Sequence, residues 1–170
     1  MPLIKFGEIS PIIGELTFIA QNAFIIGDVT IGADSSVWHG CTIRGDVNRI
    51  VIGESTNIQD GTTIHVGSHK DGSTIIGQCV TVGHSCLLHA CTLMDNTFVG
   101  MGSLIMDGAL IEENAMLGAG SLLTEGKHIR SGELWLGRPA KFARRLTTDE
   151  ISHIRKSAEK YSILARQYMR

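Results

Sequence analysis

An aliphatic residue recurs every six positions along much of this chain. One series runs through Ile19, Ile25, Ile31, Val37 and Ile43. A second series runs through Leu93, Val99, Ile105, Ile111, Leu117, Leu123 and Ile129. The residue four positions later is mostly small or β-branched, as at Ala23, Val29, Ser35, Cys41 and Val47. A period of six matches neither an α-helix nor simple strand alternation, and it is typical of a β-helix.

We therefore predict an all-β solenoid, a parallel β-helix of hexapeptide repeats spanning residues 1–141. Each hexad would supply one short strand and a corner, and three hexads would complete one coil. The coils would stack roughly 4.8 Å apart with the aliphatic residues inside. Glycine often follows the aliphatic residue, as in Ile31-Gly32 and Ile52-Gly53. We expect these glycines to permit tight corners.

Residues 142–170 are expected to add a C-terminal α-helix to the same single domain. Thr147 and Glu150 have the spacing of a capping box. Apolar residues then recur at helical intervals, at Ile151, Ile154, Ala158, Tyr161, Ala165 and Tyr168. A helix of about 22 residues starting at Thr148 would pack this stripe along the outside of the solenoid.

Composition narrows the class of protein further. The chain has 170 residues and is 43% hydrophobic, which suits one domain with a substantial core. Its net charge of -2 gives no basic surface for nucleic acid. The opening stretch MPLIKFGEISPIIGEL has Gly, Pro and Glu where a signal peptide or membrane span would need apolar residues. The four cysteines form no CxxC pair, which favours small buried thiols in a reducing compartment, the cytoplasm.

The repeat is interrupted twice, and both interruptions bear on function. Nine residues instead of six separate Ile43 from Ile52, and twelve separate Ile64 from Ile76. If each excess is looped out, Ile43, Ile64 and Leu88 occupy one position in successive coils. The residues that follow them then form a column, namely Arg44, His65 and His89.

Two histidines of this column are predicted to share one face. Adjacent coils would bring His65 and His89 within the span of two imidazoles bound to one zinc ion. His84 lies on the preceding face, so a corner separates it from His89. A neighbouring subunit can supply His84 instead, and a three-sided coil favours a trimer. The remaining histidines are interpreted as ordinary surface or core residues: His39, His69, His128 and His153.

Five stretches carry a resemblance to a known family: IRGDVNRIVIG (43–53), TNIQDGTTIHV (56–66), VGHSCLLHACT (82–92), VGMGSLIMDGA (99–109) and LGRPAK (136–141). With these, the chain resembles γ-class carbonic anhydrase-like proteins of the left-handed β-helix, hexapeptide-repeat superfamily. The first three stretches together are specific. Hexapeptide repeats and the GRPAK stretch occur in many acyltransferases as well.

This resemblance implies a left-handed coil and a homotrimer with metal sites at its subunit interfaces. It implies that His65 and His89 of one subunit and His84 of the next bind zinc, with iron or cobalt as alternative family metals. Three neutral imidazoles leave zinc an open position, where the pKa of a water falls to about 7. The implied reaction is the reversible hydration of carbon dioxide to bicarbonate.

The resemblance also implies roles for four further residues. Gln59 would orient the water at the metal. Arg44, Asp46 and Asp60 would form charged pairs across or beside the interface. Their residue types alone are equally consistent with structural roles. The three charged residues would then form ion pairs, and the Gln59 amide would hydrogen-bond between coils or cap a backbone group.

The chain departs from the family's archaeal prototype at the acidic residues that assist proton transfer. Val47 occupies the first of these positions. The loop GSHKDGS, which holds the second, contains Asp71 but no glutamate. We regard His69 in that loop as an alternative proton carrier.

Two other functions compete with carbon dioxide hydration. One is acyl transfer from a thioester with a histidine as general base. A base that is also a metal ligand is not free to take a proton, so three converging histidines argue against it. The other is a non-catalytic trimeric scaffold with a structural metal site, which would lack an exchangeable water.

Overall fold

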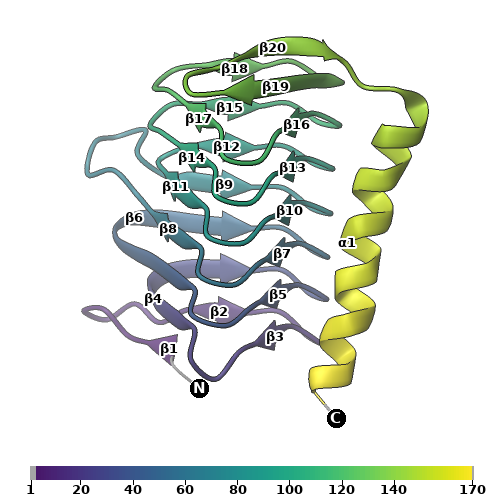
Figure 1. The fold of residues 1–170 in the computed structure, drawn as a ribbon. Helices are drawn as coiled ribbons and strands as arrows, with labels where there is room; N and C mark the ends of the chain where they lie inside the picture. The colour runs from purple at the N-terminus through teal and green to yellow at the C-terminus, as the bar shows by residue number, and fades with distance from the viewer. Residues whose placement is uncertain (1–2, 170) are drawn as a thin grey trace.

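Short parallel strands stack into a three-faced coil in the computed structural model, which describes residues 3–169 (Figure 1). The first face contains β1 (Leu3–Ile4), the opening parts of β4 (Phe24–Ile31) and β6 (Thr42–Ile52), β8 (Thr63–His65), β11 (Leu87–His89), β14 (Leu104–Ile105) and β17 (Leu122–Leu123). The second face contains β2 (Ile12–Ile13), the closing parts of β4 and β6, β9 (Thr74–Ile76), β12 (Thr92–Leu93), β15 (Leu110–Ile111) and β18 (His128–Ile129).

The third face is the one that the helix covers (Figure 1). It contains β3 (Phe18–Ile19), β5 (Ser36–Val37), β7 (Asn57–Ile58), β10 (Thr81–Val82), β13 (Phe98–Val99), β16 (Met116–Leu117), β19 (Glu133–Gly137) and β20 (Ala140–Arg145). Pairing is parallel between coils, and β19 and β20 form an antiparallel hairpin at the last coil. The predicted left-handed parallel β-helix with a C-terminal helix packed along it is confirmed.

The core is built from the aliphatic residues that define the repeat. On the first face, residues paired in register from coil to coil are all fully buried, namely Ile25, Ile43, Ile64, Leu88, Ile105 and Leu123. Each contributes roughly 1.5–3 kcal/mol of burial free energy relative to exposure. The period therefore specifies both the hydrophobic interior and the alignment of neighbouring coils.

The two interruptions of the repeat are accommodated differently. The second is looped out between β8 and β9, as predicted. The first is absorbed as a bulge within β6. Gly27 of β4 pairs with Gly45, but Val29, only two residues later, pairs with Ile50, so the extra residues of β6 lie between these two pairs. Val47, one of the small or β-branched residues four positions after a repeat aliphatic, lies in this bulge and is 52% exposed. It leaves the repeat pattern because the extra residues begin before it.

The glycines after the aliphatic residues are needed for a different reason from the one expected. Gly32 and Gly53 have ordinary negative φ values rather than left-handed ones. A Cβ at Gly32 would lie 2.6 Å from Glu54 N, and one at Gly53 would lie 2.6 Å from Gln78 N. Close contact between consecutive coils therefore excludes a side chain here. The left-handed corner residues are mostly others, such as Ser55 and Cys79.

Helix α1 (Thr148–Tyr168) begins at the predicted capping box. Thr147 Oγ1 accepts from Glu150 N at 3.2 Å, and Glu150 Oε2 accepts from Thr147 N at 2.9 Å. Its buried residues, Ile154, Ala158 and Ala165, belong to the predicted stripe. The described part of the chain contains no helix with the length and hydropathy of a membrane span.

Glu150 also forms a two-point ion pair with Arg144, at 2.7 and 2.8 Å. This pair and the bond from Thr147 lower the pKa of Glu150 from 4.5 to about 2. We expect Glu150→Gln to lower the thermal midpoint at neutral pH. The folded pKa is depressed, so the stabilisation is complete above pH 4.5 and is lost as the pH falls towards 2. Calorimetry should show the difference from wild type shrinking below pH 4.5, and a constant difference would contradict this role.

The cysteines differ in accessibility, which yields a second prediction. Cys41, Cys86 and Cys91 are buried, and Cys79 is partly exposed. Burial raises the pKa of Cys41 to about 11 and that of Cys91 to about 12. Ellman's reagent should therefore modify only Cys79 in the native protein and every thiol in guanidinium chloride. Rapid modification of the native Cys79→Ser variant would contradict the fold.

Candidate metal centre

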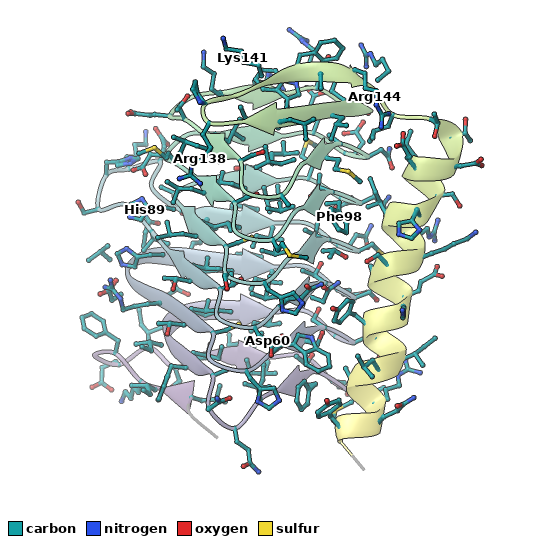
Figure 2. All side chains as sticks on the ribbon, in the orientation of Figure 1. Asp60, His89, Phe98, Arg138, Lys141 and Arg144 are labelled. Carbon is teal, nitrogen blue, oxygen red and sulfur yellow. The ribbon has the colours of Figure 1, made fainter. Side chains whose placement is uncertain are left out.

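Two of the three predicted metal ligands lie side by side on the first face. His65 on β8 pairs in register with His89 on β11, and their ring centroids are 5.2 Å apart. Both follow buried core residues, Ile64 and Leu88, so strand alternation turns both imidazoles outward. Figure 2 shows His89 on this side of the solenoid, away from the helix. The register that buries the core thus also aligns the histidines.

Asp46 holds the ring of His65. It lies in the bulge of β6, and its Oδ1 is 2.9 Å from His65 Nε2. Its other oxygen accepts a hydrogen bond from Arg44. Partial burial raises the pKa of Asp46, but the bonds with His65 and Arg44 outweigh it and hold the pKa below the usual value. The carboxylate is therefore ionised at neutral pH and orients the imidazole.

Asp107, which was not among the predicted site residues, holds the ring of His89. Asp107 Oδ1 is 2.5 Å from His89 Nδ1, and its Oδ2 is 3.6 Å from His69 Nε2. Burial raises the pKa of Asp107, while the bond and charge of His89 and the contact with His69 lower it to a net value below the usual one. The register pairs Leu88 with Ile105, 17 residues later, so the next position of the histidine column is Met106. Asp107 lies one residue beyond it, at the turn after β14, and no repeat position pointed to it.

His84 lies at a different corner, between the third and first faces. It follows β10, and its Nδ1 is 2.9 Å from Asp60 Oδ2. The side chains of both residues are more than 40% exposed. Within residues 3–169, no three His, Cys, Asp or Glu side chains of one chain are placed to hold a metal ion. The chain therefore brings His65 and His89 together and leaves His84 to face outward elsewhere.

Gln59 lies on the third face and is almost completely buried, with 6% of its surface exposed. Its Nε2 donates to Asn57 Oδ1 at 3.1 Å, and Asn57 Nδ2 donates to Thr81 Oγ1 at 2.9 Å. In the single chain, Gln59 thus belongs to a polar ladder between coils. It is adjacent in sequence to Asp60, the partner of His84.

The chemistry of the histidines suits a transition metal. The carboxylate contacts use Nε2 of His65 and Nδ1 of His84 and His89. The second ring nitrogen of each is then a candidate ligand atom. A carboxylate on the opposite nitrogen fixes the tautomer and strengthens the imidazole as a ligand. Neutral imidazoles suit zinc, iron and cobalt, so these residues fit the predicted metals.

Comparison with known proteins identifies a consistent set of relatives. Residues 10–45 match the family model described as "Bacterial transferase hexapeptide (six repeats)". The chain is 48% identical to "Gamma carbonic anhydrase 1, mitochondrial" of Arabidopsis thaliana over 98% of its own length, and it spans 62% of that protein. It is 45% identical to "Carbonic anhydrase" of Geobacillus kaustophilus, with 89% of this chain and 82% of that protein covered.

A solved structure agrees with these relatives. The crystal structure of a hexapeptide transferase family protein from Anaplasma phagocytophilum is 56% identical to this chain. It superposes with a TM-score of 0.94 and covers 98% of this chain and 97% of that one. The similarity therefore extends through the solenoid and the C-terminal helix.

Proposed function

Because this chain belongs to the γ-class carbonic anhydrase family of hexapeptide-repeat proteins, we propose that it catalyses the reversible hydration of carbon dioxide at a metal site shared between subunits of a homotrimer. The observation that carries the proposal is the in-register pair of His65 and His89, each bonded to a carboxylate. Two such imidazoles supply two of the three protein ligands that a catalytic zinc site uses, and the carboxylates orient them.

Several residues of the chain would prepare the site. His65 and His89 of one subunit and His84 of a neighbouring subunit hold the metal, and Asp46 and Asp60 orient two of these rings. Zinc is the metal we propose, with Fe²⁺ and Co²⁺ as alternatives. When bound, zinc lowers the pKa of a water to about 7 and so supplies a nucleophile for carbon dioxide at neutral pH.

Arg44 and Gln59 complete the proposed set. Arg44 keeps the Asp46 carboxylate turned towards His65, because it occupies the second oxygen. The role of Gln59 in orienting the attacking water stays a prediction, since its amide donates to Asn57 in the single chain. The unpaired cysteines support the predicted cytoplasmic location.

Exposed apolar side chains beside the histidines support the trimer. Leu87 and Met106 flank His89 on the first face, and Met101 follows His84 one coil later at the same corner. Phe24 extends this apolar surface towards the first coils. A second copy of the chain would cover these residues and present its own His84 to the pair, as closed symmetry requires.

Loss of His84 should remove metal from every site. We expect the His84→Ala protein to retain almost no zinc after dialysis, because each interface loses one ligand. Metal analysis and sedimentation measure content and oligomeric state on one sample. His128→Ala is the matched control, since His128 contacts Glu112 on the second face. Full stoichiometric metal in His84→Ala would contradict the shared site.

Mixed trimers provide a sharper test. Neither His65→Ala nor His84→Ala forms a complete site alone. An equal mixture refolded together should regain metal at about a quarter of the sites, where an intact His65 meets an intact His84. A site built within one chain would regain none.

The rate of carbon dioxide hydration should depend on the metal content of the protein. We expect stopped-flow assays of carbon dioxide hydration to give a rate that rises with zinc or iron content and disappears in His84→Ala. Trimeric protein with full metal and no hydration would contradict the proposed reaction and favour a metal-binding scaffold.

A further inference from the structure

The looped-out segment between β8 and β9 is exposed at residues 68–71, and hydrogen bonds hold its backbone in place. Gly67 N donates to Gly72 O at 2.8 Å, and Gly72 N donates to His69 O at 3.0 Å. Asn48 Nδ2 also donates to His69 O at 3.0 Å, and Ser73 Oγ donates to Asn48 Oδ1 at 2.7 Å. The backbone at His69 is thereby fixed to the bulge of β6.

This arrangement places His69 on the same carboxylate as His89. Asp107 Oδ1 is 2.5 Å from His89 Nδ1, and Asp107 Oδ2 is 3.6 Å from His69 Nε2. At 3.6 Å the second contact is longer than a hydrogen bond. The side chain of His69 is 55% exposed and that of His89 is 33% exposed. His89, Asp107 and His69 thus form a continuous path from the candidate metal centre to solvent.

The proposed reaction requires a group in this position. Carbon dioxide and water give bicarbonate and one proton: a C–O bond forms, a water O–H bond breaks, and the proton must leave. An imidazole gains and loses a proton near neutral pH, so it is suited to this transfer. His89 is unavailable because its nitrogens would be occupied by the metal and by Asp107. His69 has an exposed ring and no predicted metal.

We propose that His69 carries the proton between the site and solvent, and that Asp107 is the positioning residue that holds His69 and His89 together. The inference rests on the proposed function. The proton released on hydration passes through water to a ring nitrogen of His69, and a buffer base then removes it. Val47, at the neighbouring bulge, offers no acidic group for this task.

Kinetics separate proton transfer from the chemical step. We expect His69→Ala to lower kcat roughly 10²-fold in dilute buffer. Its kcat/KM for carbon dioxide should remain at the wild-type value, because kcat/KM reports the interconversion with bicarbonate. Added imidazole should restore kcat. The control is His128→Ala, which removes another histidine that contacts a carboxylate, with Nε2 2.7 Å from Glu112 Oε1.

Metal release tests the role of Asp107 without any assay of activity. We expect Asp107→Asn to release zinc to a chelator roughly 10–100-fold faster than wild type, because His89 loses its orienting carboxylate. The His69→Ala protein should release zinc at the wild-type rate. Equal release rates for Asp107→Asn and wild type would overturn the positioning role.

The outcomes distinguish this inference from the proposed function. If wild type hydrates carbon dioxide and His69→Ala has the same kcat in dilute buffer, the inference alone fails. If kcat falls but imidazole does not restore it, His69 has a structural role and the inference again fails. If metal-loaded wild type shows no hydration, the proposed function fails, and the role of His69 fails with it.

Discussion

Neighbouring coils of this solenoid are held in a single alignment. Parallel backbone pairing and the stacked column of buried aliphatic residues enforce the same register, as at Ile64 and Leu88. A slip of one residue would expose this column and turn His65 and His89 inward, because strand side chains alternate. The free energy that stabilises the core therefore also determines the geometry of the candidate metal centre.

The carboxylates around the histidines come from other coils than the rings they hold. Asp46 lies one coil before His65, Asp60 one coil before His84, and Asp107 one coil after His89. Partly exposed pairs of this kind contribute little to stability. Their effect is to orient imidazole rings, which is what metal binding requires. The solenoid thus supplies a rigid outer surface on which each coil completes the site of another.

Much of the fold could be predicted from the sequence because the period encodes which residues are inside. The capping box at Thr147 likewise predicts where the helix begins, since its two hydrogen bonds are local. One expectation was wrong for a physical reason. The glycines after the aliphatic residues lie so close to the next coil that a Cβ would not fit, and they do not bend the chain.

Periodicity and strand spacing suffice to predict the coil, the helix and the register that pairs His65 with His89. The path of the inserted residues and the side chains that meet across coils depend on tertiary contacts instead. The contact of Asp107 with both His89 and His69 is the main example. It depends on a loop folding back onto β6 through Asn48, and no repeat pattern encodes the path of an insertion.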